Sequence, residues 1–165
     1  MISGRVWKFG DDISTDLIAP GRLFHLRTNL PELAKHVLED ADPEFPNKVK
    51  PGDIIVAGRN FGLGSSREHA PLIIKMAGVG AVLAKSFARI FYRNAVNIGL
   101  PLLDLDTDPI PDGAILEIDL VQGRVRDKEG RIDLQATPIP HFMIRILEEG
   151  GLVPHIQKHG DFCLD

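Results

Sequence analysis

The stretch that decides the fold is Gly58-Arg59-Asn60-Phe61-Gly62-Leu63-Gly64-Ser65-Ser66-Arg67-Glu68-His69-Ala70. It follows the apolar run 53–57, which is typical of a short buried strand. Its second half opens residues 65–77, where apolar side chains recur with helical spacing. The pattern therefore predicts a strand, a glycine-rich turn and a helix in succession.

The same alternation continues along the chain. Residues 81–85 and 100–105 are apolar runs typical of strands, and residues 87–97 between them have an apolar helical face. Strand–helix–strand–helix–strand units with short connections predict a parallel sheet segment with right-handed crossovers. A further strand is expected at 4–9, ahead of the decisive stretch.

The remaining segments are more polar. Residues 10–30 show no clear periodicity and predict a long loop, which is a kind of segment that tends to carry function. Pro31 favours a helix over 32–39. The C-terminal third predicts strands at 114–120, 124–127 and 131–134, followed by helices at 141–149 and 152–159. Residues 1–165 are thus expected to form a single α/β domain with a mixed, partly parallel sheet.

The composition limits the classes of function. The chain has 165 residues and a formal net charge of −4, which argues against nucleic-acid binding through a concentrated basic face. Its apolar runs are far shorter than the roughly 20 residues that span a bilayer, and its start lacks the pattern of a signal peptide. We therefore expect a cytoplasmic protein. The single cysteine, Cys163, cannot hold an iron–sulfur cluster, which takes three or four thiolates.

The glycine-rich turn has the composition of an anion-binding site. Backbone N–H groups at a helix start point at a bound anion, and the helix dipole favours its negative charge. Gly62 and Gly64 allow close backbone approach, and Arg67 can bind a carboxylate through two parallel hydrogen bonds. Ser65 and Ser66 add hydroxyls at the same place. We therefore expect a small anionic substrate there.

Two other interpretations fit parts of this stretch. Ser65 and Glu68 have the Ser-x-x-Glu spacing of a capping box, which would be purely structural. Gly62-Leu63-Gly64 begins a dinucleotide-binding pattern, but Arg67 occupies the third glycine position and Lys85-Ser86 ends the second strand without an acidic residue. The alternative from a different functional class is a non-catalytic domain that binds an anion.

Three segments together resemble a known family. They are Asp11-Asp12-Ile13-Ser14-Thr15-Asp16, Gly62-Leu63-Gly64-Ser65-Ser66-Arg67-Glu68-His69-Ala70 and Lys85-Ser86-Phe87-Ala88-Arg89-Ile90-Phe91-Tyr92-Arg93-Asn94. In order and spacing they are similar to the small subunit of 3-isopropylmalate dehydratase and, more broadly, to the swivelling domain of the aconitase superfamily. The homoaconitase small subunit is a close relative. The resemblance implies an aconitase-like swivelling β/β/α domain with a mixed, partly parallel sheet.

The resemblance also implies a subunit of a heteromeric hydro-lyase. Its reaction moves a hydroxyl between neighbouring carbons of a hydroxy-diacid by loss and re-addition of water. A large partner subunit would carry a [4Fe–4S] cluster, in agreement with the single cysteine of this chain, and no residue of this chain would bind metal. By similarity, Ser65 removes the proton α to a carboxylate, while Ser66 and Arg67 bind substrate carboxylates beside Gly64.

The segment 21–29 is expected to select the substrate, since the family loop at this place contacts the group beside the reacting carbon. Leu23, Phe24 and Leu26 could line an apolar pocket, whereas Arg27 could pair with a third carboxylate. His25-Leu26-Arg27-Thr28 resembles a homoaconitase loop. The favoured substrate is 3-isopropylmalate, of leucine biosynthesis, and homoaconitate-type, 2,3-dimethylmalate or citramalate substrates are the alternatives.

Three further groups are interpreted as structural. Arg89 and Arg93 lie four apart on one predicted helix face, where a solvated or ion-paired role is favoured over contact with the substrate or the large subunit. Residues 12–16 are interpreted as a turn or as support for the site. His155 and His159 have a metal-binding spacing, but the sequence indicates no third ligand, so a surface helix end is favoured.

Overall fold

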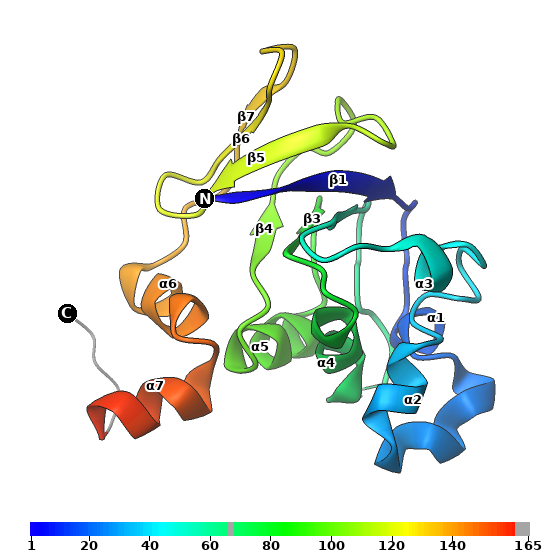
Figure 1. Ribbon diagram of the computed structural model, residues 1–165. Coiled ribbons are helices and arrows are strands. Elements are labelled where there is room, and N and C mark those ends of the chain that lie inside the picture. The colour runs from blue at the N-terminus through cyan, green and yellow to red at the C-terminus, as the bar shows by residue number, and fades with distance from the viewer. Residues whose placement is uncertain (66–67, 161–165) are drawn as a thin grey trace.

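The fold is built around one seven-stranded mixed sheet with the order β4-β3-β2-β1-β5-β6-β7 (Figure 1). The computed structural model describes residues 1–65 and 68–160. Four neighbouring strands run parallel, namely β1 (Ile2–Lys8), β2 (Ile54–Val56), β3 (Ala81–Ala84) and β4 (Leu102–Asp104). Three more extend the sheet in antiparallel fashion from β1, namely β5 (Ile115–Asp119), β6 (Arg124–Asp127) and β7 (Asp133–Gln135).

Most of the helices lie on one side of the four parallel strands, and the antiparallel strands β5, β6 and β7 lie on the other side (Figure 1). In chain order the helices are α1 (Thr15–Ile18), the 3-10 helix η1 (Gly21–Thr28), α2 (Leu30–Ala34), α3 (Phe45–Lys48), α4 (His69–Met76), α5 (Arg89–Asn97), α6 (His141–Glu148) and α7 (Leu152–His159). Within residues 1–65 and 68–160, none of them is long and apolar enough to cross a membrane.

Hydrophobic side chains pack on both faces of the parallel half of the sheet. In β2, Ile55 joins a cluster formed with α2, α4 and α5, while Ile54 and Val56 join a second cluster formed with β5, β6 and α6. All three side chains are fully buried. A strand covered on both faces needs a continuous run of apolar residues. This is why the apolar run within residues 53–57 predicts a buried strand. The expected mixed, partly parallel α/β sheet is confirmed.

The helix expected at 65–77 starts one turn later than predicted, because α4 begins at His69. Pro71 explains the difference. Proline lacks a backbone N–H and is tolerated in the first turn of a helix, where that group has no partner in any case. A helix from Ser65 would have placed Pro71 in its interior, so this proline was the available signal for the true start.

The long loop expected at 10–30 is also wrong, because that region contains α1, η1 and the start of α2. These helices are short, and side-chain N-caps hold α1 and α2. Ser14 Oγ accepts a hydrogen bond from Leu17 N at 3.2 Å, and Asn29 Oδ1 accepts one from Glu32 N at 3.4 Å. Helices of one turn show no long apolar period, so periodicity missed them. The helix predicted over 32–39 is likewise shorter, and α2 ends at Ala34.

Candidate active site

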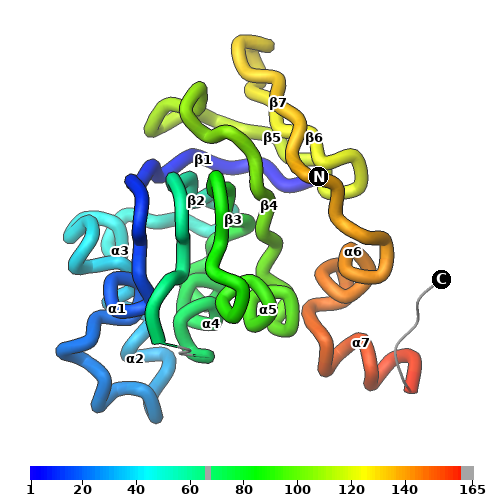
Figure 2. The backbone as a smooth tube through the Cα atoms, turned by 180° about the vertical axis from the view of Figure 1, so that it is seen from behind, coloured from blue at the N-terminus to red at the C-terminus, as the bar shows by residue number. Residues whose placement is uncertain are grey.

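The segments that follow β1, β2 and β3 run side by side and bring the three sequence motifs together (Figure 2). Asp12 N in the first segment donates to Arg59 O in the second at 2.8 Å. Phe61 N in the second donates to Ser86 O in the third at 3.1 Å. Ligand sites of open α/β sheets lie outside the carboxyl ends of parallel strands, and these segments occupy that position.

Polar side chains fix the first two segments against each other. Asp11 Oδ1 accepts a hydrogen bond from Arg59 N at 2.7 Å, and Asn60 Nδ2 donates to Asp12 Oδ1 at 3.0 Å. Asp12 and Asn60 both adopt positive φ, 57° and 60°. Non-glycine residues in this region store strain that is concentrated at functional sites. The supporting role expected for residues 12–16 agrees with these contacts.

The turn between the second segment and α4 depends on two glycines. Gly62 has a φ of 85°, and a Cβ atom there would lie 2.2 Å from Phe91 Cγ. Gly64 has a φ of 111°, and a Cβ atom there would lie 3.2 Å from Thr15 Oγ1. Larger residues would therefore be strained by the backbone conformation and, at Gly62, would also collide with α5.

A buried threonine holds the backbone of an exposed serine at the end of this turn. Thr15 Oγ1 donates a hydrogen bond to Ser65 O at 3.0 Å, and Thr15 N donates to Leu63 O at 2.8 Å. Thr15 is only 2% exposed, whereas Ser65 is exposed. The hydrogen bond between Thr15 and Ser65 could not be predicted from local sequence patterns, because the two residues lie 50 positions apart.

Ser65 lines a pocket of about 200 Å³ together with Thr15, Gly64, Arg89 and Asn94. The first turn of α5 forms one side of this pocket, so the positive end of a helix dipole lies at it. The helix whose start lines this pocket is thus α5, whereas the sequence predicts an anion site at the start of the helix that follows the glycine-rich turn. Arg89 lines this pocket together with Ser65 and is exposed to solvent, so the solvated role favoured for it from the sequence is compatible with a place at the pocket.

The capping box expected from Ser65 and Glu68 is not formed. Glu68 itself is the N-cap of α4, and its side chain makes no capping hydrogen bond. A capping box needs the serine at the N-cap and the glutamate three residues later. The expected substrate-binding residues Ser66 and Arg67 lie outside the described residues.

An ion pair lies farther along the same edge of the sheet, where Lys85 Nζ is 2.7 Å from Asp108 Oδ1. The hydrogen bond from Lys85 lowers the pKa of Asp108, and the same bond raises the pKa of Lys85. Both groups are therefore charged at neutral pH. The pair joins the segment after β3 to the loop after β4.

The expected specificity segment forms η1 and does not line the Ser65 pocket. Leu23 and Leu26 pack against the hydrophobic core, while Phe24 is 46% exposed. The Arg27 guanidinium carbon lies 4.3 Å from the centroid of the Phe24 ring, and Arg27 Nη1 donates to Phe24 O at 3.2 Å. His25 and Thr28 are exposed as well. The described pocket therefore reaches none of the residues expected to select the substrate.

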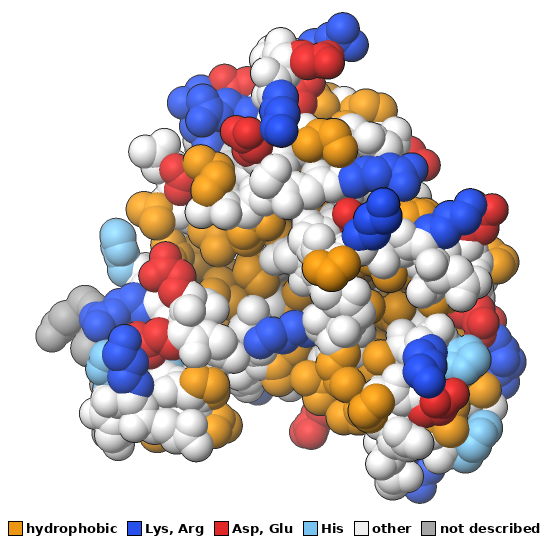
Figure 3. All heavy atoms as spheres, in the orientation of Figure 1, with side chains coloured by type: hydrophobic (Ala, Val, Ile, Leu, Met, Phe, Trp, Pro, Cys, Tyr) orange, Lys and Arg blue, Asp and Glu red, His pale blue; other side chains and the backbone are white. Residues whose placement is uncertain are grey.

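Charge on the molecular surface is mixed in sign. On the face drawn in Figure 3, Lys and Arg side chains alternate with Asp and Glu, and the described residues form no continuous basic surface there. This distribution agrees with the small formal net charge of −4.

Comparisons with known proteins identify the family of the chain. The aconitase C-terminal domain family matches residues 24–108. The chain is 65% identical over 158 residues to 3-isopropylmalate dehydratase small subunit 2 of Archaeoglobus fulgidus, covering 96% of both chains. It is 51% identical to the isopropylmalate/citramalate isomerase small subunit of Methanocaldococcus jannaschii, covering 96% of this chain and 95% of the other. A crystal structure of 3-isopropylmalate dehydratase from M. jannaschii superposes with a TM-score of 0.90 at 48% identity, covering 96% of this chain and 95% of that one.

Proposed function

Because the chain belongs to the family of 3-isopropylmalate dehydratase small subunits, part of a hydro-lyase of leucine biosynthesis, we propose that it supplies the proton-transferring wall of a shared active site. The observation that carries this proposal is the pocket that unites Ser65, Gly64 and Arg89 at the end of three parallel strands. The remaining wall would come from a large subunit.

In this proposal Ser65 acts as the base. Its oxygen takes the proton from the carbon α to a carboxylate, and the electron pair of that C–H bond forms a C=C bond. The C–O bond to the neighbouring hydroxyl breaks, and the hydroxyl leaves as water after it accepts a proton. Re-addition with the two positions exchanged gives the isomeric hydroxy-diacid.

A serine hydroxyl needs help to act as a base, because its ordinary pKa lies far above neutral pH. Preorganised positive charge where the oxyanion forms supplies such help. The first turn of α5 and Arg89 line the same pocket as Ser65, and both favour a negative oxygen there. We assign substrate-carboxylate binding to Ser66, Arg67 and Gly64 by family similarity, with Arg89 as an additional cation.

The proposed enzyme needs a [4Fe–4S] cluster that this chain cannot hold. Cluster irons are bound by cysteine thiolates, and this chain has one cysteine in all. The cluster is therefore assigned to the large subunit, where it would polarise the leaving hydroxyl as a Lewis acid. The residues of this chain would bind the carboxylates, move the proton and close the pocket to water.

The proposed substrate is 3-isopropylmalate, in keeping with the relatives that carry its name. Citramalate is a second candidate, since the M. jannaschii relative is an isopropylmalate/citramalate isomerase subunit. Arg27 is exposed and its guanidinium contacts Phe24. Homocitrate, which has a third carboxylate, is therefore included among the substrates to be tested.

Reconstitution with a large subunit tests the proposal. The two chains are purified separately, combined anaerobically with iron and sulfide, and assayed for kcat/KM on isopropylmalate, citramalate, dimethylmalate and homocitrate. We expect turnover only by the combined chains, with the highest kcat/KM on isopropylmalate. Turnover by this chain alone would contradict the shared site, and turnover of homocitrate alone would contradict the substrate.

Arg27→Val tests the role of η1 in the same assay. If Arg27 contacts a third carboxylate, the change costs a tricarboxylate several kcal/mol in kcat/KM, about 10²-fold or more, and spares alkyl substrates. Arg22→Val is the matched control, since Arg22 belongs to the same helix but pairs with Glu39 and Asp40. Equal effects of both variants would remove Arg27 from substrate selection.

A further inference from the structure

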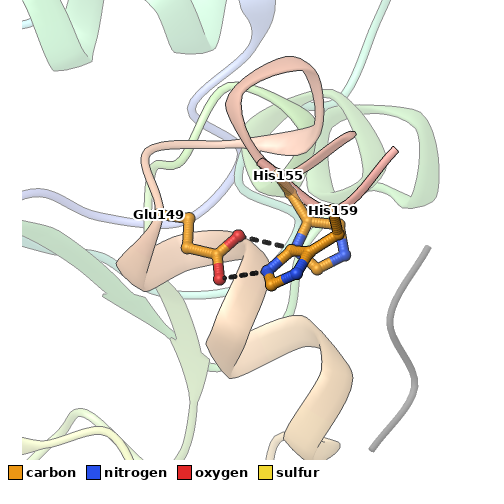
Figure 4. A group of neighbouring side chains, drawn as sticks. All are labelled: Glu149, His155 and His159. Carbon is orange, nitrogen blue, oxygen red and sulfur yellow. Dashed lines mark hydrogen bonds and ion pairs between the residues drawn. The ribbon is translucent and has the colours of Figure 1, made fainter. Parts of the chain in front are cut away.

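Two histidines and a glutamate meet at the C-terminal end of the described chain (Figure 4). His155 and His159 lie four residues apart on α7, and Glu149 is the C-cap residue that directly follows α6. Figure 4 shows both imidazole rings directed at the Glu149 carboxylate. The carboxylate is the third group that the sequence did not indicate, because a turn separates it from the histidines.

The three side chains are close and largely shielded from water. His155 Nδ1 lies 2.7 Å from Glu149 Oε2, and His159 Nε2 lies 2.8 Å from Glu149 Oε1. All three candidate ligand atoms lie within 4.8 Å of one another. The His155 side chain is fully buried, and those of Glu149 and His159 are 15% and 22% exposed.

The backbone holds this arrangement in place before anything binds. Gly150 and Gly151 turn the chain back on itself with φ values of 92° and 124°. A Cβ atom at Gly151 would lie 2.5 Å from Asn97 O, so the turn is seated tightly against the end of α5. Because the turn fixes α7 relative to α6, binding of a ligand would cost little conformational entropy of the chain.

We propose that Glu149, His155 and His159 form a binding site for a divalent transition-metal ion, specifically zinc. Imidazole nitrogens and a carboxylate oxygen are a ligand set that zinc uses in tetrahedral sites, with a water in the fourth position. At bond lengths of about 2.0–2.1 Å, the ligand atoms of such a site are about 3.4 Å apart. Shifts of at most about 1.5 Å would bring the present atoms to that spacing.

The chemistry of the cluster favours zinc over magnesium or calcium, because those ions take oxygen ligands almost exclusively. Lys158 Nζ lies 3.8 Å from Glu149 Oε1 with its side chain 66% exposed, and it can turn away into solvent when a metal ion arrives. Zinc would replace the two His–Glu hydrogen bonds by three metal bonds.

The proposed site is distinct from the Ser65 pocket. None of its three residues lines that pocket, and α7 lies at the opposite end of the helical layer from α1 and α2 (Figure 1). Bound zinc would join α7 to the end of α6 across the Gly150–Gly151 turn. Its effect is therefore expected on stability, and turnover by the reconstituted enzyme should not require it.

Thermal unfolding of the full chain with and without zinc tests the site. The measurement is made in a Cys163→Ser background, so that the thiol cannot bind the ion. Zinc at 100 times its Kd should raise Tm by roughly 5–10 °C, a chelator should reverse the shift, and magnesium should give none. Calorimetric titration should show one zinc per chain, and cobalt should give the visible absorption bands of a tetrahedral site.

Two variants and one control decide the assignment. His159→Ala and Glu149→Gln should each abolish the zinc-dependent shift in Tm and the cobalt bands, and neither removes the fully buried His155. His36→Ala should retain both signals, although His36 also pairs with a carboxylate, 3.1 Å from Glu39 Oε2. Absence of a shift in the Cys163→Ser chain, or its persistence in both site variants, would overturn the proposal.

Discussion

At the residue scale, removing the hydroxyl of Ser65 and removing that of Ser14 are expected to have different effects, because the first is proposed to act in catalysis and the second caps a helix. Ser65→Ala should lower kcat by roughly 10²–10⁴-fold with little change in KM, because a general base acts in the transition state. Ser14 Oγ caps α1, so Ser14→Ala should instead cost about 1 kcal/mol of stability and leave kcat nearly intact. Steady-state kinetics of the reconstituted enzyme and urea unfolding of each variant check both. A near-normal kcat for Ser65→Ala would remove Ser65 from the chemistry.

Thr15 acts on the site through the backbone of Ser65 and is a positioning residue. Thr15→Val keeps the side-chain shape but removes the hydrogen bond to Ser65 O. We expect kcat to fall by about 10–100-fold, since small displacements of a reacting group are costly, and the unfolding free energy to fall by about 1 kcal/mol. Thr15→Ser restores the hydroxyl and should recover most of kcat. Equal losses in both variants would indicate that packing alone is responsible.

At the scale of elements, the energetic importance of the close contact between the glycine turn and α5 can be measured by substituting two glycines that have similar φ values but different surroundings. Gly62→Ala combines a φ of 85° with a collision against Phe91, whereas Gly130→Ala has a φ of 73° and nothing within 4 Å. We expect losses of about 3 kcal/mol for Gly62→Ala and about 1 kcal/mol for Gly130→Ala. Urea unfolding of the two variants gives the difference, which is the cost of the close approach itself. Equal losses would mean that Phe91 moves aside freely.

The elements that could be predicted from the sequence are those whose burial requires a recognisable pattern of apolar residues. β2 and β3 are buried on both faces and therefore read as continuous apolar runs. The one-turn helix α1 depends on its Ser14 cap, and the irregular η1 depends on Leu23 and Leu26, which pack against the core. Neither feature produces a detectable apolar period. The start of α4 was misplaced because the serines suggested a cap more strongly than Pro71 suggested a boundary.

The candidate site was predictable in its motifs but not in its contacts. Gly62, Gly64 and Ser65 lie within four positions of one another in the sequence, so their proximity could be predicted without knowledge of the fold. The place of Arg89 at the pocket could not be predicted, because the position of α5 relative to the glycine turn depends on how the segment after β3 runs beside Phe61. Such contacts arise from pairing between strands, which short-range patterns do not encode.

On the scale of the whole molecule, the response of stability to pH includes the pair Lys85 and Asp108. The lowered pKa of Asp108 means that its contribution is present above the ordinary value of 3.8 and is lost as pH falls through the lower folded value. The raised pKa of Lys85 means that its contribution is present below 10.5 and is lost as pH rises through the higher folded value. Between these limits, Asp108→Asn should have a slightly lower Tm than the wild type.

Scanning calorimetry across pH checks this prediction, with Lys85→Met and the double variant as controls. Because Asp108 is 73% exposed, the difference should be small and should shrink in high salt. The double variant should lose no more than either single variant. A difference that grows toward acid pH would have the wrong sign and would contradict the pairing.

The position of β1 has a consequence for how the protein is made. The middle strand of the sheet is synthesised before both of its neighbours, since Ile2 pairs with Ile118 on one side and Val6 pairs with Ile54 on the other. Such distant pairings give a high contact order, which slows folding because long loops must close first. Until residues 115–119 have been synthesised, one edge of β1 keeps its backbone N–H and C=O groups unpaired and open to other nascent chains. During that interval, any cover for this edge of β1 has to come from other molecules, because β5, the strand that pairs with it, has not yet been made.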